Sequence, residues 1–324
     1  MPEPTLQQDE SHPVRVAVVG VGAVGATFAY ALLLSGLASE IVLIDANRGK
    51  AEGEAMDLNH TVPFTHPTRI WAGDYADCAG AAVTVLAAGV GQKPGQSRME
   101  CLQANARIWR EIVPQIARHN PHGILLVATN PVDVLTYAAL KLSGLPPARV
   151  LGSGTILDTA RFRFLLSQHF GVDARSVHAY IIGEHGDSEV AAWSLANIAG
   201  MRLQEYCRAQ GLVYEPGEMQ KIFESTRDAA YRIIERKGAT YYAVAAGLLR
   251  ITQSILRHQN TVLSVSSLIE DYCGISDVCF SLPTVVDRGG IQSVLRLELD
   301  ETEKTQLRHS AEVLQKTIAA LDLK

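Results

Sequence analysis

The amino-acid sequence lacks several features that mark large classes of proteins. It has no excess of basic residues, since 29 Lys and Arg stand against 34 Asp and Glu and the net charge is −5. This balance offers no footprint for nucleic acid or for an anionic membrane surface. The most apolar long run, residues 26–38, is interrupted by polar residues and glycine and is too short to span a bilayer. Residues 1–13 are polar and carry no secretory signal, so we expect a cytoplasmic protein with no membrane or nucleic-acid partner.

Cysteine is scarce, and its distribution argues against a disulfide or metal framework. The cysteines are odd in number and form no C-x-x-C pair, which predicts buried packing residues in a reducing compartment and no metal site. The sequence also lacks internal repeats and low-complexity segments. Its composition, 47% hydrophobic and 19% charged over 324 residues, is that of a globular protein long enough for two domains. The cysteines are Cys78, Cys101, Cys207, Cys273 and Cys279.

Residues 14–45 have the pattern of a dinucleotide-binding βαβ unit. An apolar, β-branched run is followed by glycines at G-x-G-x-x-G spacing, an apolar helical run, and a second apolar strand that ends in Asp45. We expect Gly20 to permit a tight turn, Gly22 to let the backbone approach a pyrophosphate, and Gly25 to let the helix pack closely. The helix N-terminus favours phosphate, and a carboxylate at position 45 binds ribose hydroxyls but repels a 2′-phosphate, which predicts NAD rather than NADP. The predicted cofactor residues in this stretch are Gly20, Gly22, Ala23, Val24, Gly25 and Asp45.

Further apolar strands alternate with helical patterns along the first half of the chain. Right-handed crossovers between such strands give a parallel sheet with helices on both faces. We therefore predict an α/β fold, with a flexible tail over 1–13, a Rossmann-type doubly wound parallel sheet over 14–152 and a mixed α+β substrate domain over 153–324. Helices are expected at 51–60, 101–119, 157–166, 218–238, 240–257 and 303–323, and strands at 68–72, 81–88, 124–128, 150–154, 177–182 and 261–268.

The segments that follow these strands are the candidate site, because ligands bind parallel sheets beyond the carboxyl ends of the strands. Residues 89–98, which begin with Gly89 and contain three glycines and a proline, are expected to form a mobile loop. Asn130 follows the strand at 124–128, and Pro131 is expected at the first position of the next helix. An Asn-Pro pair is also typical of a simple turn, so this alternative stays open for Asn130.

Five motifs occur in order along the chain: Gly-Val-Gly-Ala-Val-Gly, Gly-Gln-Lys-Pro-Gly-Gln-Ser-Arg, Thr-Asn-Pro-Val-Asp, Leu-Asp-Thr-Ala-Arg-Phe-Arg and Gly-Glu-His-Gly-Asp-Ser. Together they resemble the lactate/malate dehydrogenase family, and its bacterial L-lactate dehydrogenases most closely. The likeness covers almost the whole chain after residue 13. It implies reversible hydride transfer between NADH and pyruvate, giving L-lactate, with NAD as the cofactor.

The resemblance implies a role for each polar group that the reduction of a 2-keto acid requires. His185 is implied as the proton donor to the carbonyl oxygen and, in reverse, as the base, which suits an imidazole with a pKa of about 6.5. Asp158 is implied as the carboxylate that hydrogen-bonds this imidazole. Arg161, three residues later on nearly the same helix face, is implied as the bidentate anchor of the substrate carboxylate. Arg98, at the end of the glycine-rich loop, is implied to stabilise the negative charge that develops on the carbonyl oxygen.

Gln92 is implied as the residue that selects the substrate. In this family glutamine at this position accompanies lactate dehydrogenase and arginine accompanies malate dehydrogenase, because a second buried carboxylate needs a cationic partner. Pyruvate is therefore favoured, while the neighbouring Lys93 keeps malate dehydrogenase, or an enzyme for other 2-hydroxy acids, open as the alternative. Thr240 is implied to pack near the small substrate group, or alternatively to cap a helix.

The resemblance also implies residues at the nicotinamide end of the cofactor. Asn130 is implied to bind either the substrate or a nicotinamide ribose hydroxyl, and Gly89 and Ser153 are implied to line the same region. These residues follow different strands of the predicted sheet, so the sequence places them at one edge.

The segment around Arg98 departs from the commonest family pattern. Gln96 stands where glutamate is usual, and Met99, Glu100 and Cys101 replace a more apolar start to the helix. The arginine itself is retained, so the departure concerns how the loop closes.

Arg163 and His178 match the two basic positions at which bacterial members of the family bind fructose 1,6-bisphosphate between subunits. Paired cations can hold phosphate, so the resemblance implies an activator site and a homotetramer, with a dimer as the alternative. Both residues can equally be polar surface groups. A hypothesis from outside the enzymes is that the protein is a non-catalytic NAD-binding sensor. The proton donor and the two carboxylate-directed arginines argue against this hypothesis, because a sensor does not need them.

Overall fold

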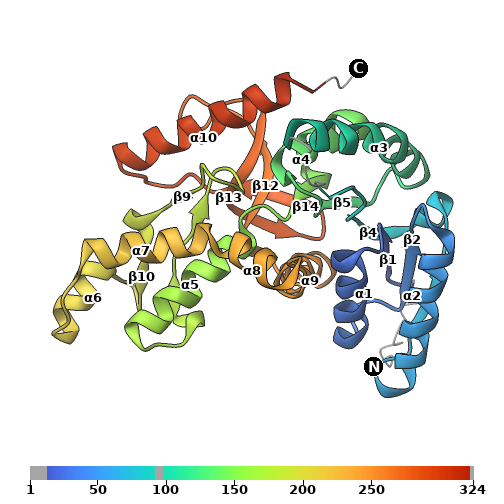
Figure 1. The fold of residues 1–324 in the computed structure, drawn as a ribbon, viewed down its shortest axis with the longest axis horizontal. Coiled ribbons are helices and arrows are strands. Elements are labelled where there is room, and N and C mark those ends of the chain that lie inside the picture. The colour runs from blue at the N-terminus through green and yellow to red at the C-terminus, as the bar shows by residue number, and fades with distance from the viewer. Residues whose placement is uncertain (1–12, 92–97, 322–324) are drawn as a thin grey trace, which may run out of the picture.

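The first predicted strand, β1 (Arg15–Val19), lies inside a nine-stranded sheet of the computed structural model, which describes residues 13–91 and 98–321 (Figure 1). Its side chains alternate between two cores, because Val16 and Val18 pack on one face of the sheet and Ala17 and Val19 on the other. Burial on both faces is what its β-branched apolar sequence predicts. The strands that run parallel with it are β2 (Glu40–Ile44), β3 (Arg69–Ala72), β4 (Ala81–Leu86), β5 (Ile124–Val127) and β6 (Val150–Gly152).

The sheet continues beyond β6 with strands from the second half of the chain. The strand order is β14-β13-β12-β6-β5-β4-β1-β2-β3, and the first three of these strands pair antiparallel with their neighbours. Within this sheet β12 pairs with β6, with Ser266 opposite Gly152. The parallel Rossmann-type sheet is therefore confirmed, and the strand expected at 261–268 is present as β12 (Thr261–Ile269). The sequence did not predict that β12 would extend this sheet in antiparallel pairing, nor the strands β13 (Val278–Asp287) and β14 (Gly290–Val294).

Helices cover both faces of the sheet, as the alternating pattern predicted. Phe28 of α1 and Leu248 of α9 belong to one core, and these two helices lie side by side in Figure 1. Trp109 of α3 and Leu135 of α4 belong to the core on the opposite face, together with Leu307 of α10. The helices are α1 (Ala23–Ser35), α2 (Arg48–Thr61), α3 (Arg98–His119), α4 (Val132–Ser143), α9 (Tyr242–Leu256) and α10 (Glu301–Ala319).

The middle of the second half forms a smaller region with its own core. Phe162 and Leu166 of α5 lie at its centre, and the Phe162 ring meets Trp193 edge-on with 4.9 Å between ring centroids. Its helices are α5 (Ile156–Phe170), α6 (Leu203–Gln210), α7 (Pro216–Arg227) and α8 (Ala229–Lys237). Its strands are β7 (Val177–His178), β8 (Ile181–Ile182), β9 (Val190–Ala191), β10 (Asn197–Ile198) and β11 (Met201–Arg202). Short 3-10 helices lie at Val62–Phe64, Tyr75–Cys78, Pro147–Arg149, Ala174–Ser176 and Trp193–Leu195.

Three local predictions were wrong. The strand expected at 177–182 is divided into β7 and β8, because β7 pairs with β10 while β8 pairs with β9 in a separate sheet. The helix expected at 218–238 is interrupted at Asp228, where α7, which buries Met219 and Thr226, gives way to the more exposed α8. Pro131 precedes α4 instead of opening it, since its ψ of 115° is extended and not helical.

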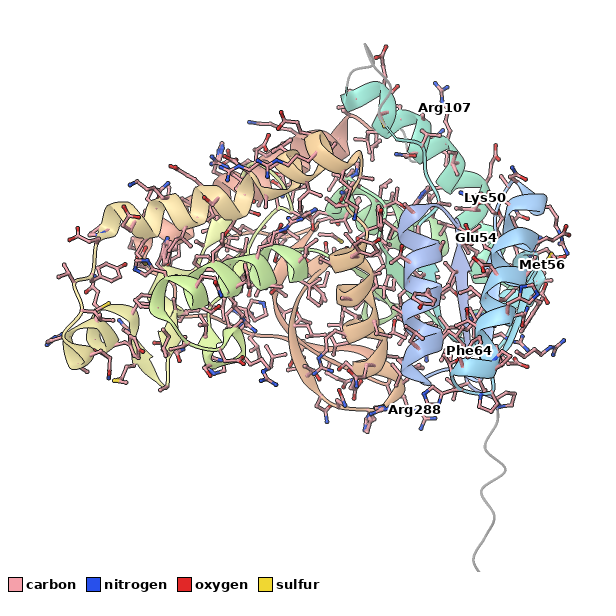
Figure 2. All side chains as sticks on the ribbon, turned by 60° about the horizontal axis from the view of Figure 1, so that its bottom comes forward. Lys50, Glu54, Met56, Phe64, Arg107 and Arg288 are labelled. Carbon is pink, nitrogen blue, oxygen red and sulfur yellow. The ribbon has the colours of Figure 1, made fainter. Side chains whose placement is uncertain are left out.

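The surface and the cysteines add further detail. Figure 2 labels Met56 on α2 and Arg107 on α3, and both residues are exposed. The cysteines are free thiols, but only Cys78, Cys207 and Cys279 are buried, whereas Cys101 and Cys273 are partly exposed, contrary to the expectation of buried packing residues. None of the helices in the described part of the chain combines the length and apolar character that a bilayer crossing requires.

Candidate active site

The turn between β1 and α1 has room for a side chain at only one of its three motif glycines. Gly20 has a φ of +93°, and a Cβ there would lie 2.4 Å from the Ala88 backbone nitrogen. A Cβ on Gly25 would lie 2.0 Å from the Gly20 carbonyl oxygen, so the close packing predicted for this glycine is present. A Cβ on Gly22 would meet nothing within 4 Å. The turn therefore has no room for a side chain at Gly20 and Gly25, whereas the space around Gly22 is open.

Asp45 lies directly after β2 and is bonded to this turn. Its Oδ2 accepts a hydrogen bond from Val21 N at 2.9 Å, and its Oδ1 accepts one from Asn47 N at 2.9 Å. The residue stays partly exposed. Because Ala23 and Val24 open α1 without an acidic residue in its first turn, the N-terminal N–H groups keep their attraction for an anion. This open glycine turn beside a fixed carboxylate fits the pyrophosphate and ribose of a dinucleotide.

Three predicted nicotinamide-end residues follow neighbouring parallel strands, as expected. Gly89 follows β4, and a Cβ there would lie 2.6 Å from Thr129 Cγ2, so the backbone passes very close to the segment that carries Asn130. Asn130 follows β5 and is exposed. Ser153 follows β6, and its N–H donates to Val127 O at 2.8 Å. The carboxyl edge of β4, β5 and β6 thus brings these residues to one end of the sheet.

The loop that carries the predicted substrate selector lies mostly outside the described residues. Gln92 falls there, as do Lys93 and Gln96, and Arg98 is described only as the first residue of α3. The described start of the loop is tied to α3, because Asn105 Oδ1 accepts from Val90 N at 2.7 Å. Cys101, one of the unusual residues at the helix start, donates its thiol to Val90 O at 3.4 Å, while Met99 and Glu100 are exposed.

The predicted proton donor and its carboxylate partner are in direct contact. His185 Nδ1 lies 2.5 Å from Asp158 Oδ2, and Arg161 donates from Nη1 to Asp158 Oδ1 at 2.9 Å. The carboxylate side chain is only 3% exposed, whereas the imidazole is 22% exposed and the Arg161 side chain 13%. Asp158 and Arg161 share the first turn and a half of α5, which explains how one helix presents both groups. The arrangement leaves Nε2 as the imidazole nitrogen that can exchange a proton with a ligand.

Burial and neighbouring charges set the protonation states of this cluster. Burial opposes protonation of His185, but the charge and hydrogen bond of Asp158 outweigh it, and the pKa of the imidazole rises to about 9. Burial also disfavours the ionised Asp158, yet the cations of His185 and Arg161 hold its pKa below the ordinary value. The imidazole is therefore protonated and Asp158 ionised near neutral pH.

Two buried carboxyl groups beside this cluster were missed by the sequence analysis. Asp133 is 1% exposed, and its Oδ2 accepts a hydrogen bond from His185 N at 2.7 Å. Glu189 is 7% exposed, and burial followed by the charge of Asp158 raises its pKa far above the ordinary value, so it is neutral near pH 7. Asp133 closes the Thr-Asn-Pro-Val-Asp motif, which was the available signal, whereas only burial distinguishes Glu189 from a surface glutamate.

The remaining predicted residues lie in the smaller region. Arg163 donates from Nε to Ala179 O at 2.8 Å and stacks 4.9 Å from the Tyr180 ring centroid, so its guanidinium lies next to the backbone that carries the exposed His178. Thr240 is partly buried, and the residue that precedes the first turn of α9 is Tyr241. The alternative of Thr240 as the helix cap is therefore wrong.

Within the described part of the chain, no group of three or more histidine, cysteine, aspartate or glutamate side chains could hold a metal ion. The chemistry available at this site is acid–base transfer through His185, anion binding through arginine, and dinucleotide binding at the glycine turn.

Comparison with known proteins gives the family of the chain. The lactate/malate dehydrogenase NAD binding domain matches residues 14–152, and the lactate/malate dehydrogenase alpha/beta C-terminal domain matches residues 155–322. The L-lactate dehydrogenase of Acetivibrio thermocellus is 53% identical over 309 residues, which are 95% of this chain and 98% of that protein. That of Priestia megaterium is 52% identical over 303 residues, 94% of this chain and 95% of that protein. The crystal structure of the minor L-lactate dehydrogenase from Enterococcus mundtii, in a ligand-bound form, superimposes with a TM-score of 0.93 at 40% identity and covers 96% of this chain and 99% of that one.

Proposed function

Because the chain belongs to the lactate/malate dehydrogenase family, we propose that it interconverts pyruvate and L-lactate with His185 as the proton donor and acceptor. The chain is an NAD-dependent oxidoreductase, and NAD is its cofactor. The observation that carries the proposed mechanism is the 2.5 Å contact between His185 Nδ1 and Asp158 Oδ2. It supports an imidazole that is loaded with a proton before the keto acid is reduced.

In the direction of reduction, His185 gives the proton on Nε2 to the carbonyl oxygen of the keto acid. The raised pKa of about 9 keeps that proton in place at neutral pH, and the ionised Asp158 stabilises the charged imidazole. In the direction of oxidation the neutral imidazole removes the hydroxyl proton, and Asp158 stabilises the imidazolium that forms. The aspartate acts as a charge and an orienting acceptor.

Two arginines handle the charges of the substrate in this proposal. Arg161 and His185 bind the two different oxygens of Asp158, and the planar guanidinium of Arg161 suits a bidentate bond to the substrate carboxylate. Arg98 stabilises the negative charge that grows on the carbonyl oxygen. The position of Arg98 at the start of α3 supports this role, since it links the loop to a helix packed on the sheet.

The glycine turn and Asp45 would hold the cofactor. The open position at Gly22 would admit the pyrophosphate, the α1 N-terminus at Ala23 and Val24 would attract its charge, and Asp45 would bind the ribose hydroxyls. Gly89, Asn130 and Ser153 would line the nicotinamide end. When bound, NADH supplies the hydride that reduces the carbonyl carbon.

Pyruvate is the proposed keto acid because Gln92 offers no cation for a second carboxylate. The test is steady-state NADH oxidation with pyruvate and with oxaloacetate, for the wild-type enzyme and for Gln92→Arg. We expect pyruvate to be preferred, and the variant to gain oxaloacetate turnover. A wild-type preference for oxaloacetate would mean that another cation, such as Lys93, serves the second carboxylate, and malate dehydrogenase would replace the proposal.

The same assay separates an enzyme from a sensor. Tight NADH binding without turnover of any 2-keto acid would support a non-catalytic NAD-binding protein. A preference for bulkier keto acids would instead indicate that the pocket is larger around the methyl group of the substrate, where Thr240 is proposed to pack.

A second candidate function is activation by fructose 1,6-bisphosphate in a homotetramer. It is favoured by Arg163, whose Nε donates to the carbonyl oxygen of Ala179, one residue after the exposed His178. A sugar bisphosphate bound there between subunits would favour an active assembly. We expect the effector to lower the KM for pyruvate, and Arg163→Gln to remove that response. Identical substrate curves with and without the sugar would rule out this regulation.

We also propose that the enzyme works in the cytoplasm.

A further inference from the structure

The loop that carries His185 is anchored through consecutive backbone N–H groups. Each of them donates to a different structural element, so the loop is fixed from several directions. The bonds are Gly183 N to Ser281 O on β13 at 2.9 Å, Glu184 N to Ser310 Oγ on α10 at 2.8 Å, and His185 N to Asp133 Oδ2 on α4 at 2.7 Å. Only the bond of His185 itself uses an ionisable acceptor.

Asp133 is an unusual choice of anchor because its carboxyl group is almost completely buried. The residue is 1% exposed, and its Oδ1 has no hydrogen bond of normal geometry to any residue the structure describes. A neutral hydroxyl or carbonyl serves the two preceding N–H groups, so a carboxylate is not needed for packing alone. Removing a buried carboxyl from water is unfavourable unless it is compensated. A carboxyl group buried at this position therefore points to a task in the reaction that a neutral group would perform less well.

The two carboxylates around His185 hold different parts of it. Asp158 on α5 binds the ring at Nδ1, whereas Asp133 on α4 binds the main-chain nitrogen of the same residue. With the backbone and the ring both fixed, the direction of Nε2 is determined. A misplacement of about 1 Å in a catalytic group can cost about 100-fold in rate, so such double fixing matters for proton transfer.

We propose that Asp133 is a positioning residue for the reaction, which holds the His185 main chain so that Nε2 faces the carbonyl oxygen of the substrate. This inference rests on the proposed role of His185 as proton donor. It adds a direct link between the two ends of the site, because Asp133 lies three residues after Asn130, on the segment proposed to contact the nicotinamide end. The position of the proton donor is thereby tied to the segment that lines the hydride donor.

The charge of Asp133 supports the same task. Burial raises the pKa of this carboxyl group to about 6, against the opposing influence of the Ser266 hydroxyl and the His185 N–H, and Glu184 raises it further. The His185 imidazole charge also lowers the pKa of Asp133. The buried Cys279 thiol is a further titratable group near it, and its pKa lies well above the ordinary value. Above pH 6 the ionised Asp133 therefore adds to the charges that keep the His185 imidazole protonated.

Asp133→Ala and Asp133→Asn test the proposal, because the first variant removes the acceptor and the second removes only the charge. We expect Asp133→Ala to lower kcat for pyruvate by about 10- to 100-fold while NADH binding, measured by fluorescence, stays within about twofold. The primary deuterium isotope effect on kcat with deuterated NADH should rise, because the chemical step becomes rate-limiting. Amide hydrogen exchange at His185 should accelerate in the cofactor-free protein, whereas exchange at Gly183 should not.

Asp133→Asn should recover most of the lost kcat, since an amide oxygen can still accept from His185 N. Its rate should decline at lower pH than that of the wild type, because a negative charge near the imidazole is gone. Ser310→Ala is the matched control, as it removes the anchor of the neighbouring Glu184 and leaves the His185 anchor in place. We expect its kcat to fall less than that of Asp133→Ala.

The outcomes separate this inference from the proposed function. If the wild-type enzyme does not reduce pyruvate, or if His185→Gln is as active as wild type, the proposed function fails. If both behave as expected but Asp133→Ala keeps its kcat within twofold, the positioning role is overturned. An equal loss in Asp133→Ala and Ser310→Ala would also overturn it, since the loop would then be sensitive to any loosening. Should Asp133→Ala not fold, an Asp133→Asn variant with unchanged pH profile and a large loss of kcat would contradict the proposal.

Discussion

The two ends of the candidate site are held together by different forces. At the cofactor end, the turn from Gly20 to Gly25 and the carboxylate of Asp45 belong to one βαβ unit, and its contacts are steric fits and hydrogen bonds to nearby backbone. At the proton-donor end, His185 depends on carboxylates 27 and 52 residues away along the chain, on two different helices. The cofactor end should therefore respond mainly to changes of shape, and the proton-donor end to changes of charge.

The difference also concerns exposure to water. Asp45 is partly exposed, so its charge acts through solvent and is weakened by it. Asp158 has a side chain only 3% exposed, and its charge is strong enough to raise the pKa of its neighbour to about 9. Substitutions that remove one charge should accordingly have much larger effects at the proton-donor end.

The largest expected effect comes from His185→Gln, which removes the proton donor and keeps a polar side chain. We expect kcat for pyruvate to fall by about 10²- to 10⁴-fold, the usual contribution of a positioned acid, while NADH affinity remains near that of the wild type. Stopped-flow NADH oxidation and NADH fluorescence titration measure the two quantities. His60→Gln, at an exposed position on α2, is the control. A loss smaller than tenfold would assign the proton to another group.

Asp158→Asn should sharpen the comparison by removing the charge without removing the imidazole. Reduction needs the protonated imidazole, so the wild-type rate should decline as the pH rises through about 9. In the variant, the charge of Asp158 no longer outweighs the effect of burial, so the pKa of His185 falls. The decline in rate should therefore begin at a lower pH than in the wild type. The measurement is kcat/KM for pyruvate as a function of pH.

The same raised pKa predicts a stability effect with a definite sign. A protonated His185 stabilises the fold fully below its ordinary pKa of 6.5, and this contribution is lost as the pH rises through about 9. Between pH 6.5 and about 9, the Tm of the wild type should therefore fall more than the Tm of Asp158→Asn. Equal pH profiles of rate and of stability in the two proteins would show that Asp158 does not control the imidazole.

The cofactor end of the site could be predicted from the sequence better than the proton-donor end, because its residues lie close together in the chain. The glycine turn and Asp45 lie within 32 consecutive residues, and their roles follow from spacing, because neighbours in the chain are neighbours in the fold. The contact between His185 and Asp158 was expected only through the family resemblance, since no local pattern connects α5 with a loop 27 residues later. Asp133 was part of a quoted motif without a role, because its importance depends on burial and on the path of a distant loop.

The fold shows a similar limit. The parallel strands around β1 were predicted well, since strands buried on both faces read as continuous apolar runs. β13 and β14 were not predicted, although β13 is largely buried, and the joining of β12 to β6 is a long-range pairing that local propensity does not encode. The division of the expected strand at 177–182 has the same origin, because its two halves find partners in separate sheets.

Gly25→Ala and Gly22→Ala test whether the cofactor end responds to shape. The added Cβ on Gly25 would lie 2.0 Å from the Gly20 carbonyl, so the backbone must shift and the free energy of unfolding should fall by about 1–3 kcal/mol. The Cβ on Gly22 meets nothing within 4 Å, so that variant should keep its Tm and bind NADH about tenfold more weakly, because the methyl group blocks the pyrophosphate. Thermal unfolding and NADH titration distinguish the two effects. A lowered Tm in Gly22→Ala, or an unchanged Tm in Gly25→Ala, would contradict the assignment of the open position.

Asp45→Asn is the smallest of the expected effects and tests the exposed charge directly. The amide oxygen can still accept one of the two bonds from Val21 N and Asn47 N, so the turn should keep its shape. Losing the charge removes the repulsion of a 2′-phosphate, and the ratio of kcat/KM for NADPH to that for NADH should rise by about three- to tenfold, a modest change because solvent screens this carboxylate. Asp57→Asn, at an exposed position on α2, controls for the change in net charge. A rise of 100-fold or more would show that Asp45 acts as a buried charge like Asp158, and the contrast between the two ends would then lie in their position along the chain and not in their electrostatics.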